Sequence, residues 1–214
     1  MGPALDEVRE KLSDLDGDAV VSEAYPEVLV ETRAPAVAKA LLSEFGTSIY
    51  SLTGASLEEV VGGLLIATGR TLATAESCTG GLIGHRVTNV PGSSAYYRMG
   101  FVTYSNQAKV DLLDVPGEII DREGAVAEDV ARNMVKGALS RSGADLAVSV
   151  SGIAGPGGGT PGKPIGTVWF AAGSRGDIGT VRKEWQGDRE RVKHASACQA
   201  LDMIRRLCIG APLS

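Results

Sequence analysis

The chain has 214 residues and a formal net charge of −5, with 43% hydrophobic and 22% charged residues. This mix is typical of globular proteins and argues against disorder, and the length suits one large domain or two smaller ones. The negative charge argues against a strong electrostatic attraction to nucleic acid, and no apolar run approaches the length that spans a bilayer.

The cysteines and histidines restrict the chemistry further. Three cysteines, Cys78, Cys198 and Cys208, are too far apart for a zinc pattern and form no paired disulfide framework. An odd number of widely spaced cysteines suits a reducing cytoplasm, and the sequence shows no signal peptide. The two histidines, His85 and His194, cannot supply a histidine metal cage. We therefore expect a cytoplasmic protein that needs no metal or cofactor and binds neither membrane nor nucleic acid.

Residues 1–52 predict a small α/β domain. Apolar periodicity and turn residues indicate helices at 5–12 and 35–45 and strands at 19–23, 28–32 and 49–52. Pro35 suits the first turn of the second helix, and Gly46 suits its C-terminal cap. The region has few core-forming residues, so we expect a partial domain that does not fold alone.

A second domain is predicted over residues 56–210. Ser56 and Glu59 form a capping box that begins a helix ending near Gly69. Beyond it, strands are expected at 71–75, 99–104, 145–151, 165–172 and 178–185, and helices at 79–88, 106–113, 126–139 and 189–208. This alternation, which closes with a hairpin through residues 173–176, predicts a three-layer αβα sandwich with a mixed sheet.

The strongest chemical pattern combines a hydroxyl, a phenol and an amine. Ser77 follows an apolar run and precedes Gly80 and Gly81, while Tyr104 and Lys109 lie a few positions apart further along the chain. Serine is a weak nucleophile until a base removes its proton, and a lysine whose pKa is lowered by burial can be that base. The pattern predicts a Ser/Lys hydrolase with a nearby tyrosine. A serine in an ordinary turn and a solvated lysine are the simpler alternatives.

The segment after Ser77 predicts an anion-binding site where a strand meets a helix. The N–H groups of residues 79–81 are expected to stabilise an oxyanion or to hold a phosphate. A plain helix cap by Ser77 or Thr79 is the structural alternative. Cys78 at a helix N-terminus, with His85 as its partner, is a rival nucleophile, although His85 falls one to two turns along the same helix.

Two further segments suit ligand binding. The loop at 152–163 approaches a phosphate-binding P-loop, but Pro164 replaces the required hydroxyl and offers no N–H, so an ATPase is rejected. The first N–H groups of this loop are still expected to wrap a nucleotide or to form a pocket wall. Segment 187–189, with Arg191 beyond it, predicts either an arginine site for phosphate or a helix capped by Asp188.

These motifs occur together, in the same order, in one known family. The chain resembles the C-terminal domain of the CinA family, also called competence/damage-inducible proteins, in Lys109 and in segments 75–81, 92–94, 100–106, 124–126, 151–156, 166–169 and 187–189. The stand-alone form of that domain is nicotinamide-nucleotide amidase (PncC). The resemblance covers about residues 56–208. Residues 4–52 resemble the end of the CinA middle domain, and the pyrophosphatase activity of the larger N-terminal CinA domain is not expected here.

The resemblance implies hydrolysis of the amide of nicotinamide mononucleotide to nicotinate mononucleotide and ammonia, in pyridine nucleotide recycling. It implies Ser77 as nucleophile, Lys109 as general base and Tyr104 as a proton relay or orienting group, without a metal. Substrate contacts are implied for Thr79, Gly80, Gly81, Ser94, Ser151, Gly152, Arg189 and Arg191. A homo-oligomer is expected from the family. Two alternatives stay open: an amidase for another small amide, and a nucleotide-binding regulatory module without turnover.

Overall fold

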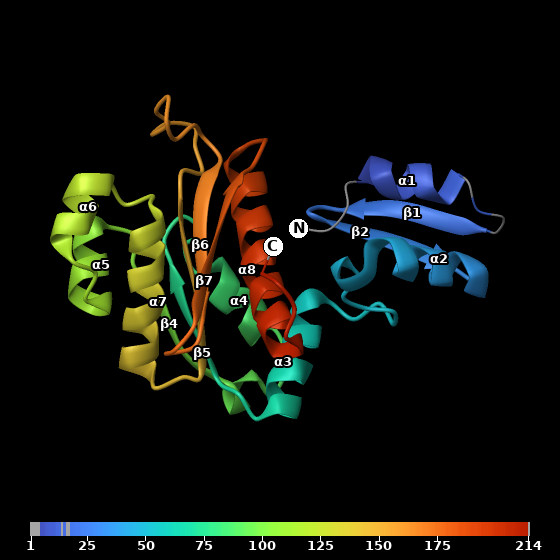
Figure 1. The fold of residues 1–214 in the computed structure, drawn as a ribbon, viewed down its shortest axis with the longest axis horizontal. Coiled ribbons are helices and arrows are strands. Elements are labelled where there is room, and N and C mark those ends of the chain that lie inside the picture. The colour runs from blue at the N-terminus through green and yellow to red at the C-terminus, as the bar shows by residue number, and fades with distance from the viewer. Residues whose placement is uncertain (1–4, 14, 16–17, 214) are drawn as a thin grey trace. The chain divides into compact units, whose positions relative to one another are not determined.

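The computed structural model describes residues 5–13, 15 and 18–213. The chain divides into two compact units, with the boundary between Ala55 and Ser56 (Figure 1). The first unit combines a β-hairpin with two helices. The second unit is a five-stranded sheet between two layers of helices.

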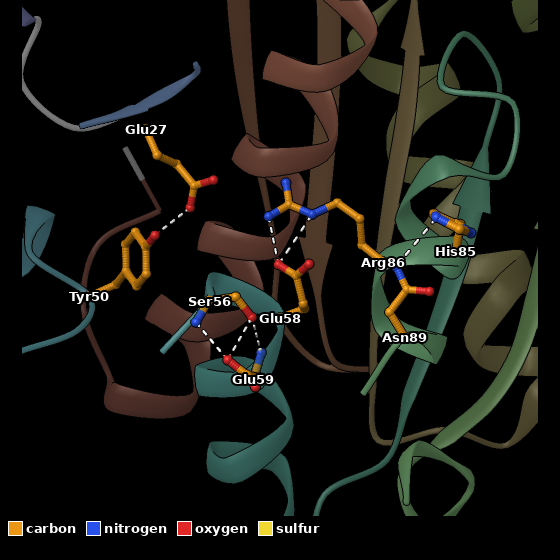
Figure 2. Close-up of polar contacts among 8 residues, drawn as sticks. All are labelled: Glu27, Tyr50, Ser56, Glu58, Glu59, His85, Arg86 and Asn89. Carbon is orange, nitrogen blue, oxygen red and sulfur yellow. Dashed lines mark hydrogen bonds and ion pairs between the residues drawn. The ribbon is translucent and has the colours of Figure 1, made fainter. Parts of the chain in front are cut away.

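The first unit follows the sequence prediction closely. It contains helix α1 (Leu5–Ser13), strands β1 (Ala19–Ala24) and β2 (Glu27–Thr32), and helix α2 (Pro35–Phe45). The strands pair as an antiparallel hairpin, and each element lies within one residue of its predicted position. The predicted strand at 49–52 is wrong, because a 3₁₀ turn follows α2 and this segment then runs without regular structure. Its Tyr50 hydroxyl instead donates to the Glu27 carboxylate (Figure 2).

The core of the first unit is small. Among its described residues, only Val8, Val37 and Leu41 are buried apolar side chains. On the hairpin, Val20 and Leu29 remain 66% and 42% exposed. A core of this size contributes little hydrophobic free energy, which agrees with the scarcity of core residues in the sequence. That the unit does not fold alone remains a prediction.

The second unit is built on one mixed sheet in the order β4-β3-β5-β6-β7. Its strands are β3 (Leu72–Glu76), β4 (Tyr97–Val102), β5 (Leu146–Gly152), β6 (Thr167–Gly173) and β7 (Ile178–Glu184). Strands β4, β3 and β5 run parallel, whereas β6 and β7 are antiparallel to their neighbours. The predicted mixed sheet and late hairpin are confirmed. The carboxyl ends of the three parallel strands meet at one edge.

Helices cover both faces of this sheet, which confirms the three-layer αβα prediction (Figure 1). On one side of the sheet lie α5 (Asn106–Leu113), α6 (Gly117–Glu123) and α7 (Glu128–Ser142), with α7 directly against the strands. On the other side lie α3 (Leu57–Thr68), α4 (Leu82–Thr88) and α8 (Arg189–Ile209), with α3 packed on α8. Ala73 and Ala75 lie two positions apart on β3, so strand alternation places them on the same face of the sheet. Both belong to the core cluster that contains Met134 of α7.

Helix α3 begins with the predicted capping box (Figure 2). The Ser56 hydroxyl accepts from the N–H of Glu59 at 3.3 Å, and the Glu59 carboxylate accepts from the N–H of Ser56 at 2.8 Å. A second contact in the same view joins this helix to α4, since Arg86 donates to the Glu58 carboxylate at 2.6 Å. The capping box therefore closes the first turn of α3, and the ion pair between Glu58 and Arg86 joins this turn to α4.

Other boundaries near the sheet edge differ from the prediction. Helix α4 begins at Leu82 rather than at residue 79, because Gly80 and Gly81 adopt left-handed φ angles of +64° and +98° in a turn. Strand β4 ends at Val102, so Tyr104 lies in the following loop and does not end a strand. The short helix α6 was not predicted, and α7 begins two residues later than expected.

Gly137 on α7 has no room for a side chain. A Cβ there would lie 2.0 Å from the carbonyl oxygen of Leu113, at the end of α5. Because a backbone carbonyl cannot move aside as a flexible side chain does, we expect Gly137→Ala to lower the free energy of unfolding by about 3 kcal/mol or more. Both tryptophans, Trp169 and Trp185, belong to this unit, so tryptophan fluorescence during urea unfolding measures the effect.

Gly63→Ala is the matched control for that measurement. Gly63 is also helical, but nothing lies within 4 Å of the position its Cβ would take. This variant should be neutral or more stable by about 0.5–1 kcal/mol, since alanine is the better helix former. Equal effects of the two substitutions would contradict the close packing of α7 on α5.

Candidate active site

Ser77 lies directly after β3, at the edge where the parallel strands end. Its N–H donates to the carbonyl of Val150 on β5 at 3.0 Å, which fixes the residue against the neighbouring strand. The residue is 8% exposed and begins the turn that leads to α4. Ligands of layered α/β proteins bind at the carboxyl ends of strands, so Ser77 stands where a substrate is expected.

Lys109 extends from α5 to the same place. The hydroxyl of Ser105 caps this helix by accepting from the N–H of Ala108 at 3.0 Å, and Lys109 follows one residue later. Its Nζ lies 3.1 Å from Ser77 Oγ and 2.8 Å from the carbonyl oxygen of Thr103. The fold therefore brings the predicted hydroxyl and amine within proton-transfer distance.

The surroundings of Lys109 favour its uncharged form. The residue is 1% exposed, and this burial lowers the pKa of Lys109. Its two hydrogen-bond partners are uncharged, and within the described part of the chain it forms no ion pair. The adjacent Cys78 offers no anion, because burial raises the pKa of its thiol to about 12. A neutral amine has a lone pair that can accept the proton of the Ser77 hydroxyl.

The alternative pair of Cys78 and His85 is not formed. Burial raises the pKa of Cys78 far more than the charges of Lys109 and Arg189 lower it, so the thiol stays protonated at neutral pH. His85 is exposed on α4, where its Nε2 lies 3.3 Å from the side-chain nitrogen of Asn89 (Figure 2). Cys78 thus lacks both the thiolate and the histidine that a cysteine nucleophile needs.

The turn after Ser77 uses part of its backbone internally. The N–H of Gly80 donates to the Ser77 carbonyl, and the N–H of Gly81 donates to the Glu76 carboxylate, each at 3.0 Å. A donor that already has an intramolecular acceptor is not available to a substrate oxyanion. The structure therefore corrects the expectation that Gly80 and Gly81 stabilise the oxyanion through their N–H groups.

Cys78 and Thr79 supply the remaining backbone donors of this turn. Neither N–H donates to another described residue; the only described partner of the Cys78 N–H is the thiol of Cys78 itself. The Thr79 hydroxyl is also buried without a partner in that part of the chain. Since these two residues directly follow Ser77, their N–H groups are the ones suited to an oxygen on a carbon bonded to Ser77.

Glu76 is the residue of this site that the sequence analysis missed. It is 1% exposed, at the last position of β3. Its carboxylate accepts from the N–H groups of Gly81, Ile83 and Gly84 at distances of 2.8–3.0 Å. The available signal was an acidic residue at the end of an otherwise apolar strand, immediately before Ser77.

Tyr104 and Arg189 form a second group. The phenol oxygen of Tyr104 accepts from Arg189 Nη2 at 2.8 Å, and Nη1 of the same guanidinium donates to the Gly155 carbonyl at 2.7 Å. Tyr104 is 59% exposed, and among the described residues it has no hydrogen bond to the serine–lysine pair. One guanidinium thereby joins α8, the glycine-rich loop and the segment after β4.

The beginning of α8 has the predicted Asp188 cap and also places Arg189 where the predicted phosphate site would need it. The Asp188 carboxylate caps the helix by accepting from the N–H of Arg191 at 2.8 Å. Arg189 is nevertheless held by the partners just described, and its positive charge acts on the pKa of Cys78. The Arg191 side chain covers Gly187, with Cδ 2.9 Å from the position that a Cβ there would take.

Ser151 and Gly152 support this edge by packing. Ser151 is fully buried, and its hydroxyl donates to the Ala125 carbonyl at 2.7 Å, so the expected substrate hydrogen bond cannot use that proton. A Cβ on Gly152 would lie 2.6 Å from Cγ2 of Val168 on β6. Glycine here allows β5 and β6 to approach each other at the end of the ladder.

Ser94 is not brought to this edge. It lies in the 3₁₀ turn Ser93–Ala95 that precedes β4, and β4 runs parallel to β3. Because Ser77 follows the end of β3, the length of a strand, roughly 16 Å, separates the two serines. The expected contact of Ser94 with a substrate at Ser77 is therefore not formed within one chain.

The glycine-rich loop ends in a structural tether. Lys163 donates through Nζ to the carbonyl of Glu123 at the end of α6, and its backbone pairs with that of Thr160. A P-loop lysine would instead need to reach a phosphate. The rejection of an ATPase is consistent with this arrangement. In the described part of the chain, no three His, Cys, Asp or Glu side chains gather as a metal site would require.

No described helix is long and apolar enough to cross a bilayer.

Comparison with known proteins identifies relatives over the second unit. Residues 54–208 match the family described as the CinA C-terminal domain. A putative competence-damage inducible protein of Symbiobacterium thermophilum is 52% identical in an alignment 177 residues long that covers 78% of this chain and 42% of the relative. A CinA-like protein of Geotalea daltonii is 46% identical over 167 residues, which are 78% of this chain and 40% of that protein. The chain spans less than half the length of these curated relatives.

Solved structures agree with this result. The chain is similar to a CinA superfamily protein of Klebsiella pneumoniae, with a TM-score of 0.69 and 38% identity over 73% of this chain and 99% of the other. It is also similar to the competence/damage inducible protein CihA of Agrobacterium tumefaciens, with a TM-score of 0.68 and 41% identity over 73% of this chain and 98% of the other.

Proposed function

Because this chain belongs to the CinA family, we propose that its second unit is an amidase that converts nicotinamide mononucleotide to nicotinate mononucleotide and ammonia. The observation that carries this proposal is the 3.1 Å contact between Ser77 Oγ and the buried Nζ of Lys109. An amide needs a strong nucleophile, a base, and a proton donor for the departing nitrogen, and one neutral lysine can serve as both base and donor. We place the reaction in the cytoplasm, in pyridine nucleotide recycling.

The first half of the proposed reaction forms an ester on Ser77. Lys109 Nζ takes the hydroxyl proton as Oγ attacks the carboxamide carbon, and negative charge develops on the amide oxygen. The N–H groups of Cys78 and Thr79 stabilise that charge. The Lys109 ammonium then donates its proton to the amide nitrogen, the C–N bond breaks, and ammonia leaves.

The second half restores the protein. A water molecule gives a proton to neutral Lys109 and attacks the ester carbon, and the same two N–H groups again stabilise the oxyanion. The C–Oγ bond breaks, Ser77 recovers its proton, and nicotinate mononucleotide is released. The carboxylic acid that forms loses its own proton to water, which leaves nicotinate. Ser77 and Lys109 account for the other protons that move.

Arg189 is the proposed contact for the phosphate of the substrate. A guanidinium binds phosphate through several N–H donors, and Arg189 presents its group between two loops beside the turn that carries Ser77. The phosphate is remote from the reacting carbon, so its binding energy can hold the amide in position for attack.

Ammonia release tests the proposal directly. The purified chain should release ammonia from nicotinamide mononucleotide at the rate at which nicotinate mononucleotide appears. Ammonia from other small amides but not from the mononucleotide would favour the broader amidase. Tight binding of the mononucleotide without ammonia would favour a regulatory module and would overturn the proposal.

Arg189→Ala should lower kcat/KM for the mononucleotide and not for a substrate that lacks the phosphate. Loss of a hydrogen-bonded charge pair costs about 1.5–3 kcal/mol, so kcat/KM for the mononucleotide is expected to fall by about 10- to 150-fold. Nicotinamide riboside lacks the phosphate, and its kcat/KM should stay within about threefold of wild type. Arg189→Lys keeps the charge but loses the planar guanidinium, and its kcat/KM for the mononucleotide should lie between those of wild type and Arg189→Ala. An equal loss for both substrates would show that Arg189 acts by holding Tyr104 or Gly155 instead.

A further inference from the structure

Glu76 occupies an unusual place for an acidic residue. It is the last residue of a fully buried strand, it is 1% exposed, and it directly precedes Ser77. Within the described residues it pairs with no lysine or arginine. A buried carboxylate without a cation is unfavourable unless hydrogen bonds replace its water, so its partners must be backbone groups.

Three N–H groups at the beginning of α4 provide that replacement. Oε2 accepts from Gly81 and Ile83 at 3.0 Å each, and Oε1 accepts from Gly84 at 2.8 Å. The helix has no side-chain cap of its own, because its N-cap position is Gly81. Glu76 therefore does from the preceding strand what a capping side chain normally does from within the helix.

This arrangement decides which donors the turn leaves available. Gly81, Ile83 and Gly84 donate to Glu76, and Gly80 donates to the carbonyl of Ser77. The N–H groups of this turn that donate to no other described residue are therefore those of Cys78 and Thr79. We propose that Glu76 is a positioning residue: by holding the strand end and the helix start together, it fixes the turn so that the N–H groups of Cys78 and Thr79 form the oxyanion hole. This inference rests on the proposed amidase function.

The three hydrogen bonds to Glu76 are needed to offset its negative charge next to the oxyanion. An oxyanion on the attacked carbonyl forms one residue away from this carboxylate, and two neighbouring negative charges repel each other strongly in a buried site. Three N–H donors and the positive end of the α4 dipole counter the carboxylate locally. Glu76 can therefore set the shape of the turn without opposing the charge that develops beside Ser77.

The test compares two glutamate-to-glutamine variants of the full chain. Glu76→Gln keeps the size of the side chain but turns an NH₂ group toward an N–H donor, so the turn must relax. Loss of an oxyanion donor lowers kcat by about 10²- to 10³-fold, and we expect a loss of this order with KM changed by less than about threefold. Glu76→Asp, which keeps the charge at a shorter reach, should lie between Glu76→Gln and wild type.

Glu58→Gln is the matched control. Glu58 also holds α4, but through Arg86 and from α3, and it touches no N–H of the turn (Figure 2). It should lower the melting temperature while keeping kcat within about threefold of wild type. If both variants lowered kcat in proportion to their loss of melting temperature, Glu76 would be an ordinary structural residue and the inference would be overturned.

A spectroscopic measurement on the wild-type chain does not depend on any variant folding. Pyridine-3-boronic acid forms a tetrahedral adduct with a reactive serine and places an oxygen where the oxyanion would be. In ¹⁵N-labelled protein, we expect the amide proton resonances of Cys78 and Thr79 to shift downfield on adduct formation, with those of Gly81, Ile83 and Gly84 nearly unchanged. A shift at Gly81 in place of Cys78 and Thr79 would overturn the inference.

The two proposals fail in different ways. Wild-type chain that releases no ammonia from the mononucleotide would contradict the amidase function. Wild-type chain that is active, together with a Glu76→Gln variant of near-normal kcat, would leave the amidase in place and remove Glu76 from its positioning role.

Discussion

Ser77→Ala is expected to reduce ammonia release from nicotinamide mononucleotide by a factor of at least about 10⁴, since loss of a catalytic serine removes the covalent route entirely. The substitution deletes one oxygen from an 8% exposed residue and leaves the backbone donors of the turn in place. Binding of the mononucleotide should therefore stay within about threefold of wild type. Steady-state kinetics and calorimetric titration of the two proteins measure these quantities.

Cys78→Ala is the natural comparison, because it alters the adjacent side chain and keeps the same N–H. A protonated thiol with a pKa near 12 contributes no nucleophile, so turnover should fall by less than about tenfold. The reverse pattern, in which Cys78→Ala is inactive and Ser77→Ala retains turnover, would make the cysteine the nucleophile and contradict the proposed mechanism.

Lys109→Met should reduce kcat by about 10²- to 10⁴-fold, the range that general acid–base catalysis contributes. Methionine fills a similar volume but has no lone pair for the Ser77 proton. Activity of the wild type should fall on the acid side, as Lys109 takes up a proton, with a midpoint below the value of about 10.4 for a free lysine. Near-normal turnover of the variant, or a wild-type midpoint at or above that value, would exclude Lys109 as the base.

The same variant tests the charge state through stability. Burial lowers the pKa of Lys109 in the folded chain, so the unfolded chain binds more protons between the folded and unfolded pKa values. The wild type therefore gains stability as the pH rises through that window. The melting temperature of Lys109→Met minus that of wild type should fall as the pH rises from the lowered pKa of the folded chain toward about 10.4, while any loss of the bond to the Thr103 carbonyl adds a constant. A difference that rises with pH would contradict an uncharged lysine.

Local patterns predicted a serine–lysine pair but left a turn serine and a solvated lysine open, and the family resemblance favoured the pair. An apolar run predicted the strand before Ser77, and a short helix was predicted over residues 106–113. Parallel strands in one sheet end at one edge, and the structure places Ser77 and Lys109 together there. The mixed sheet followed in the same way from alternating elements and a late hairpin. Such features depend on neighbours in the sequence, which is why they can be predicted from it.

The missed features depend on contacts between distant segments or on register. Nothing local shows that the carboxylate of Glu76 takes the N–H groups of Gly81, Ile83 and Gly84, which removes Gly81 from the expected donors and delays the start of α4. The position of Ser94 depends on the direction of β4, which only the pairing with β3 defines. Likewise, β4 ends at Val102, so Tyr104 lies in the following loop, where its hydroxyl accepts from Arg189 and does not contact Ser77 or Lys109.

No described residue forms an ion pair with Lys109, and this affects product release in the proposed reaction. In the proposed reaction, the product nicotinate mononucleotide carries a carboxylate where the substrate carries an amide, and an anion beside a buried amine favours the ammonium form. If the proposed reaction holds, we expect this product to form an ion pair with Lys109 and to keep the base protonated until the product dissociates. Such product inhibition should become stronger at lower pH. Any competing ligand with an anionic group next to Lys109 should inhibit in the same way, by keeping the lysine protonated.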